Sequence, residues 1–138
     1  MPVKLLVDTS AWIVSFRKSG HDQLKKTLIA ALDSLSVATT NIVVLELLQG
    51  CRNRKEFDAM HARLNALDTI LISDAVWSLA HATGYELRRK GITVPTVDII
   101  IAAAAKINNC SLLHHDKHFR TLAKHLHINA VDFIDTEI

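Results

Sequence analysis

The chain opens with VKLLVDTS at residues 3–10, a largely aliphatic run that ends in polar residues. A run of this length is typical of a strand buried on both faces of a parallel sheet. Asp8, Thr9 and Ser10 are residue types favoured at a helix N-terminus, where their side-chain oxygens accept hydrogen bonds from free backbone amides. The sequence therefore predicts that the chain begins with a buried strand, a turn and a helix.

The same order of elements recurs along all 138 residues. Apolar runs predict further strands, and segments with apolar residues three or four apart predict helices between them. Alternating strands and helices favour a parallel sheet with helices on both faces. We therefore expect an α/β fold, a three-layer α/β/α domain with four or five strands that spans residues 1–138 as a single domain. The expected strands cover residues 3–7, 35–38, 69–72, 110–113 and 128–133, and the expected helices include 22–33, 54–67, 74–90 and 96–108.

Composition indicates a globular protein with no strong electrostatic preference. Hydrophobic residues make up 49% of the chain, charged residues make up 22%, and the formal net charge is +2. This charge permits an anionic partner but does not demand one. Cys51 and Cys110 lie far apart, which favours reduced thiols, and the N-terminus lacks the layout of a secretory signal. We expect a cytoplasmic protein with no membrane segment, because the apolar run at residues 97–105 is too short to span a bilayer.

Four acidic residues are expected at one edge of the predicted sheet. Asp8 directly follows the first strand, and Asp116 lies three residues after the fourth, which is adjacent if the first strand is central. Glu46 lies in the helix after the second strand, and Asp98 begins an apolar helix just after Pro95. Reactive groups of open parallel sheets gather beyond the carboxyl ends of the strands. Each residue alone has a simpler explanation in helix capping, turn formation or a solvated helix face.

Taken together, the four carboxylates indicate a cation site. Clustered carboxylates repel one another and raise one another's pKa unless a cation neutralises them. Hard oxygen ligands suit Mg²⁺ or Mn²⁺. Such ions activate water and stabilise negative charge that develops on a phosphodiester. The chemistry implied by the cluster is phosphodiester hydrolysis.

Four ordered blocks of the sequence resemble those of PIN domains, particularly VapC toxins. The blocks are VDTSAWI at residues 7–13, ELLQG at 46–50, PTVD at 95–98 with IAA at 101–103, and LLHHDKHF at 112–119. The resemblance spans nearly the whole chain. It implies an α/β/α fold and a VapC-like endoribonuclease that is inhibited by a VapB-like antitoxin and forms homodimers. It also implies a catalytic and metal-binding site for Mg²⁺ or Mn²⁺ made by Asp8, Glu46, Asp98 and Asp116.

The last block departs from the family at one position. PIN domains commonly have a Thr two residues before the final Asp, and this chain has His114 there. We expect the His114 imidazole to take over by hydrogen bonding to a water molecule or a phosphate. Thr9 and Ser10 supply supporting hydroxyl groups beside Asp8.

Basic and aromatic residues give weaker indications of RNA contacts. Arg17 and Arg52 lie near the predicted openings of two site loops and are candidates for binding phosphates. The run at residues 88–90 is better explained as cations in the last turn of a helix. Trp12, Phe16 and Trp77 have helical core spacing, so we expect them to be packed rather than to stack on bases.

Three alternative interpretations remain open from the sequence. His114 and His118 are four residues apart and could bind a transition metal such as Zn²⁺ or Ni²⁺. A receiver-like signalling domain also places acidic residues and Mg²⁺ at strand ends, but it usually has two acidic residues after the first strand and a lysine after the last. A PIN domain could instead be catalytically weak, process RNA or be held by a partner.

Overall fold

The computed structural model describes residues 3–136 and contains a five-stranded sheet in which every strand pairing is parallel. The strands are short, and each is followed by helical or turn structure. This alternation confirms the α/β prediction. The strands are β1 (Leu5–Val7), β2 (Val37–Thr40), β3 (Asp68–Ile70), β4 (Ser111–Leu113) and β5 (Ala130–Val131).

The strand order is β3-β2-β1-β4-β5, so β1 lies at the centre of the sheet. Leu5 pairs with Val37 on one side and with Ser111 on the other. The chain adds strands in one direction through β3 and then returns to place β4 beside β1. In open parallel sheets the ligand-binding crevice lies at the carboxyl ends of the strands where this reversal occurs. The predicted adjacency of the first and fourth strands is therefore confirmed.

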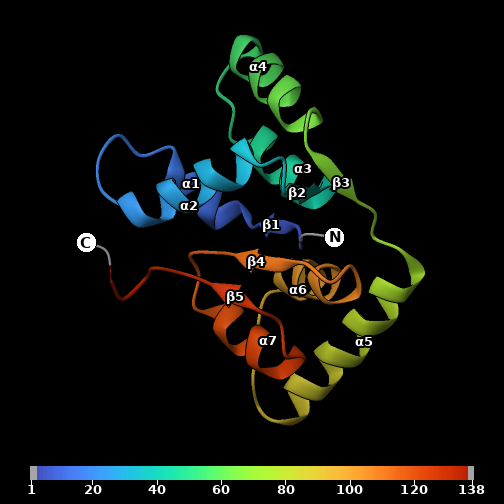
Figure 1. Ribbon diagram of the computed structural model, residues 1–138. Helices are drawn as coiled ribbons and strands as arrows, with labels where there is room; N and C mark the ends of the chain where they lie inside the picture. Colours follow the sequence, from blue (N-terminus) through green and yellow to red (C-terminus); the bar gives the residue numbers. More distant parts are fainter. Residues whose placement is uncertain (1–2, 137–138) are drawn as a thin grey trace.

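Helices cover both faces of the sheet, as Figure 1 shows. The four helices that precede β3 in the sequence pack against one another, and so do the three that follow β3. Two such groups are expected when right-handed crossovers place helices on opposite faces of the sheet. The described residues thus form the predicted three layers. The helices are α1 (Thr9–Ser15), α2 (Asp22–Asp33), α3 (Asn41–Gln49), α4 (Arg54–Asn65), α5 (Asp74–Arg89), α6 (Thr96–Ile107) and α7 (His118–Leu126).

Helix α6 is the most deeply packed part of the second helical layer. Residues 101–105, Ile-Ala-Ala-Ala-Ala, have no exposed surface, and α6 contacts α5, α7 and β4. Small side chains allow the helix to approach its neighbours closely. Gly91 directs the chain into this helix: its φ of 78° ends the turn after α5, and Ile92 N donates to Leu87 O at 2.9 Å.

Some predicted boundaries and exposures are wrong. Leu35 is 82% exposed with φ 56°, and β2 begins two residues later and extends through Thr39 and Thr40, which are fully buried. Trp12 is buried as predicted, whereas Phe16 and Trp77 are 53% and 42% exposed. Helical spacing alone does not reveal where a helix projects beyond the core. Within residues 3–136, no helix has the length and hydrophobicity needed to cross a bilayer.

Candidate active site

Asp8 is fixed at the end of the central strand by the helix that follows it. Its backbone is extended, and its Oδ2 accepts hydrogen bonds from Ser10 N at 2.9 Å and Ser10 Oγ at 2.6 Å. Asp8 is therefore the N-cap of α1, as the sequence predicts. The residue is 4% exposed. One carboxylate oxygen is held by the protein, and the carboxylate is kept at the crevice.

Ser10 also ties the first strand to the loop after β4. Its Oγ accepts a hydrogen bond from His115 N at 2.9 Å while it donates to Asp8. Asp8 N donates to Leu113 O at 2.9 Å. These contacts join the ends of β1 and β4, so the loop that contains Asp116 lies beside Asp8.

Glu46 reaches the same edge from α3. Thr40 caps this helix through a hydrogen bond from Val43 N to its Oγ1 at 3.3 Å. Glu46 then lies in the second turn, where its Oε1 accepts a 2.7 Å hydrogen bond from Thr9 Oγ1. The two hydroxyl residues that follow Asp8 therefore each hold one carboxylate, Ser10 holding Asp8 and Thr9 holding Glu46.

Asp98, Asp116 and His118 form a group of potential metal ligands within residues 3–136. One donor atom from each lies within 4.8 Å of the others. His118 Nδ1 is 2.9 Å from Asp116 Oδ1 and 3.7 Å from Asp98 Oδ2. Asp98 is in the first turn of α6, and His118 begins α7. Our sequence analysis did not place His118 with these carboxylates, although its position two residues after Asp116 was a signal.

Burial and neighbouring carboxylates raise the pKa values of two acidic residues in the site, Asp98 and Asp8. Burial, followed by the neighbouring Asp8 and Asp116 carboxylates, raises the pKa of Asp98 to about 7, while His118 opposes the shift. Burial also raises the pKa of Asp8, against the hydrogen bonds from Ser10. Glu46 adds to the upward shift of both groups. The other three predicted carboxylates thus all repel Asp98, and a bound cation would relieve this repulsion.

His114 does not occupy the position expected for it. The residue is 1% exposed; its Nδ1 accepts a hydrogen bond from Asp116 N at 3.3 Å, and its Nε2 lies 3.4 Å from Asp132 Oδ2. Burial lowers the pKa of this imidazole, against the attraction of Asp132. Both ring nitrogens face protein groups, so the expected contact with a water molecule or phosphate is wrong. His114 instead shapes the loop that presents Asp116.

The alternative of a transition-metal pair formed by His114 and His118 is not supported by this arrangement. His114 points to Asp132 beneath the loop, whereas His118 faces Asp98 and Asp116. Asp132 also accepts two hydrogen bonds from Arg120, one from Nη2 at 2.6 Å and one from Nε at 2.9 Å. The two imidazoles therefore belong to different networks.

The two candidate RNA-binding arginines contact different parts of the protein. Arg17 Nη1 is 3.2 Å from His21 Nε2, and the His21 ring contacts the His115 ring with 5.2 Å between centroids. Arg52 is highly exposed and pairs with Glu56 at 2.9 Å. Arg17 is thus linked to the loop that carries Asp116, while Arg52 lies at the end of α3.

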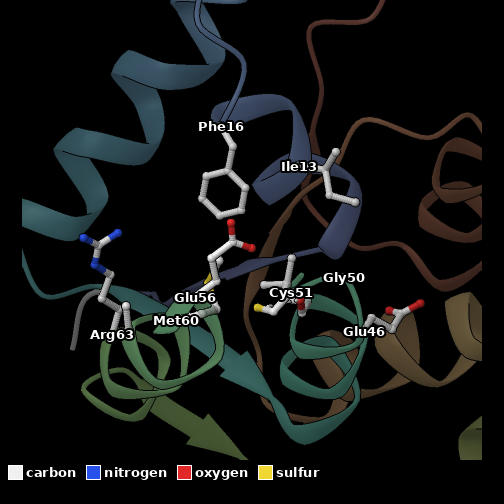
Figure 2. A pocket seen from close by; sticks show the side chains of 10 residues that line it. Ile13, Phe16, Glu46, Gly50, Cys51, Glu56, Met60 and Arg63 are labelled. Carbon is white, nitrogen blue, oxygen red and sulfur yellow. Dashed lines mark hydrogen bonds between the residues drawn. The ribbon is translucent and has the colours of Figure 1, made fainter. Parts of the chain in front are cut away.

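A groove of about 340 Å³ adjoins Glu46 between α1, α3 and α4. Figure 2 shows Ile13 and Phe16 above it, Cys51 and Met60 at its floor, and Glu46 at one end. Ile13 and Phe16 are 51% and 53% exposed. Such large apolar side chains at a groove indicate an interaction surface. The exposure of Phe16, missed by helical spacing, is explained by its position over this groove.

The fold and the acidic edge define a class of α/β domain that gathers carboxylates for a cation at the switch point of a parallel sheet. Residues 5–125 match the PIN domain, and the chain belongs to this family. It is 27% identical over 132 residues to ribonuclease VapC11 of Mycobacterium tuberculosis, covering 94% of this chain and 98% of that protein. It is 26% identical over 125 residues to ribonuclease VapC18 of the same organism, covering 85% of each chain.

Solved structures of toxin–antitoxin complexes share the fold. A chain in the crystal structure of VapBC2 from Rickettsia felis bound to a DNA fragment superposes with a TM-score of 0.77 at 18% identity, covering 94% of this chain and 98% of that one. A chain of DNA-bound VapBC from Salmonella typhimurium gives a TM-score of 0.75 at 17% identity, covering 96% and 99%. At these identities the likeness concerns the fold.

Proposed function

We propose that this PIN domain is a metal-dependent endoribonuclease and the toxin of a VapBC-type toxin–antitoxin pair. The observation that carries the proposal is the convergence of Asp98 and Asp116 with His118, whose donor atoms lie within 4.8 Å of one another, beside Asp8 and Glu46. The names of the related proteins, which are ribonucleases, support the choice of RNA as substrate.

The chemistry of these residues fits a divalent cation. Asp8, Glu46, Asp98 and Asp116 offer the oxygen ligands that Mg²⁺ and Mn²⁺ prefer, and their mutual repulsion favours a positive charge between them. A cation bound there would supply an activated water molecule and stabilise the negative charge that develops on the scissile phosphate. We propose Mg²⁺ or Mn²⁺ as the cofactor and these four carboxylates as the catalytic and metal-binding residues.

Other residues of the site have positioning or binding roles in this proposal. Ser10 and Thr9 hold the Asp8 and Glu46 carboxylates through their hydroxyl groups. Fixed ligands bind a cation with less loss of side-chain freedom, because the protein has already restricted them. Arg17 and Arg52 would bind RNA phosphates and hold the RNA near the acidic residues.

The groove beside Glu46 is a candidate binding site for a protein inhibitor, which would be a partner in addition to RNA. The apolar part of its lining, with the exposed Ile13 and Phe16, fits the apolar face of an amphipathic helix, and Glu56 and Arg63 offer charges for polar side chains of that helix. We propose a VapB-like antitoxin as its occupant, since a segment seated there would end beside Glu46 and block the acidic edge. We also propose that the protein forms a homodimer and lies in the cytoplasm. Light scattering of the purified chain tests the homodimer.

The deciding experiment is cleavage of a total-RNA pool by the purified chain with Mn²⁺ and with EDTA, alongside Asp8→Asn and Asp98→Asn. Asp33→Asn, at the exposed end of α2, is the matched control and should cleave like the wild type. Discrete products are expected with Mn²⁺ and should vanish in EDTA and in both site variants, because each variant removes a ligand charge. Cleavage that survives in both variants would refute the site, and no cleavage under any condition would favour a catalytically inactive, partner-held module.

A further inference from the structure

His118 brings an imidazole nitrogen into a site that is otherwise built from oxygen. Its Nδ1 is 2.9 Å from Asp116 Oδ1 and 3.7 Å from Asp98 Oδ2. The side chain is 47% exposed, and those of Asp98 and Asp116 are 15% and 41% exposed. The nitrogen therefore faces the two carboxylates at a partly exposed part of the protein, which an ion from solution can reach.

The position of this imidazole is set by the start of α7. His118 N donates to Asp116 Oδ1 at 3.0 Å, which fixes the first turn of the helix against the Asp116 loop. The next residue, Phe119, is fully buried, and its ring lies 5.3 Å from that of His114 between centroids. The helix is anchored on its inner side, so the His118 ring is carried to the carboxylates by packed structure.

A nitrogen ligand changes which cation such a site prefers. Mg²⁺ demands oxygen ligands and retains its water molecules, whereas first-row transition-metal ions accept imidazole readily. Carboxylates alone suit both Mg²⁺ and Mn²⁺. Replacing one oxygen donor by nitrogen therefore shifts the balance away from Mg²⁺.

We propose that His118 is a nitrogen ligand of the cation held by Asp98 and Asp116, and that it makes this site select Mn²⁺ or a later first-row ion over Mg²⁺. The proposal rests on the proposed metal-dependent function and specifies the ion. The competing role is purely orienting, in which Nδ1–H only donates a hydrogen bond to Asp116. An orienting contact would strengthen the binding of every cation equally, since it acts through the carboxylate.

Two substitutions separate these roles. His118→Ala removes both the nitrogen ligand and the hydrogen-bond donor. His118→Asn keeps an amide N–H near the position of Nδ1 but has no nitrogen lone pair to offer a metal. His115→Ala is the matched control, because His115 is a neighbouring imidazole whose ring contacts His21 and not the carboxylates.

The affinities of the purified full chain for Mn²⁺ and Mg²⁺ give the first measurement. Free Mn²⁺ is followed by electron paramagnetic resonance, and Mg²⁺ is titrated as a competitor. We expect both His118 variants to bind Mn²⁺ about tenfold more weakly or worse, with Mg²⁺ affinity within about twofold of wild type. His115→Ala should match the wild type. Equal weakening for the two ions in His118→Ala, with recovery for both in His118→Asn, would overturn the proposal in favour of the orienting role.

Pulsed paramagnetic resonance of the Mn²⁺-loaded protein gives a second readout that is independent of activity. Nitrogen coupling from a directly bound imidazole is expected in the wild type and in His115→Ala, and it should be lost in both His118 variants. If Asp98→Asn weakens Mn²⁺ binding but the wild type shows no nitrogen coupling, His118 is not a ligand and the metal site itself is retained. Mn²⁺ binding that Asp98→Asn leaves unchanged would refute the metal site itself and this inference with it.

Discussion

Asp98→Asn is expected to stabilise the metal-free protein, by an amount that grows as the pH rises. The folded-state pKa of Asp98 is about 7, compared with 3.8 for an unperturbed carboxyl. The folded state therefore holds a proton more tightly than the unfolded state does. Stability falls as the pH rises from about 4 to about 7, because ionisation in the folded state is penalised there. Asparagine resembles the neutral acid in shape and does not ionise.

The size of the effect follows from the two pKa values. Between pH 5 and pH 8, linkage gives a loss of about 2.5 kcal/mol in wild-type stability that Asp98→Asn does not suffer. The Asp98 side chain is 15% exposed, so solvent screening leaves most of this difference in place. For a domain of this size the expected gain in melting temperature of the variant over wild type grows by roughly 8–12 °C between these pH values.

The assay is thermal or urea unfolding in EDTA at several pH values, followed by circular dichroism. Asp33→Asn is the control, and its difference from wild type should stay within about 0.5 kcal/mol. Addition of Mn²⁺ or Mg²⁺ should narrow the difference at pH 8, since an ion at about 100 times its Kd adds about 2.7 kcal/mol to wild type alone. A difference between Asp98→Asn and wild type that does not change with pH would refute the desolvated, mutually repelling carboxylates.

Three further predictions concern stability and partner binding. His114→Ala should cost about 2–4 kcal/mol in urea unfolding, because the ring is 1% exposed and contacts Asp132; a loss below about 1 kcal/mol would contradict a structural role. Leu35→Gly should raise stability by about 0.5 kcal/mol, since Leu35 is 82% exposed at φ 56°, and a clear loss would argue that its side chain is packed. Phe16→Asp should weaken binding of the cognate antitoxin at least tenfold in a calorimetric titration without loss of RNA cleavage; unchanged binding would place the antitoxin elsewhere.

The sequence predicted the carboxylates at strand ends more easily than those on helices. Asp8 directly follows β1, and Asp116 follows β4 in a short loop, so strand order alone brings them to one edge. Glu46 and Asp98 also depend on where helices α3 and α6 begin, and Thr40 and Pro95 directly precede those helices. Their assignment as metal ligands stays a prediction.

The wrong predictions of burial have one physical cause, which is that hydrophobic residues were expected to be buried and polar residues exposed. Leu35 was assigned to a strand because it is apolar, yet the turn before β2 leaves it exposed. Thr39 and Thr40 are polar, yet they are buried in a strand between two neighbours. Phe16 is exposed beside a groove that forms only when α1, α3 and α4 come together. No local pattern encodes these tertiary arrangements.

The block HHDKH at residues 114–118 shows how one short segment is divided between stability and chemistry. The chain passes from β4 into α7 within it, so its side chains face different environments. His114 faces inward to Asp132, while Asp116 and His118 face the crevice. Where PIN domains commonly have a Thr, the larger imidazole fills the interior and accepts the Asp116 backbone N–H. If that contact sets the loop, His114→Ala should disturb the positions of both Asp116 and His118, and should therefore weaken Mn²⁺ and Mg²⁺ binding together. His118→Asn should weaken the binding of Mn²⁺ alone, so the two variants distinguish loop support from direct ligation.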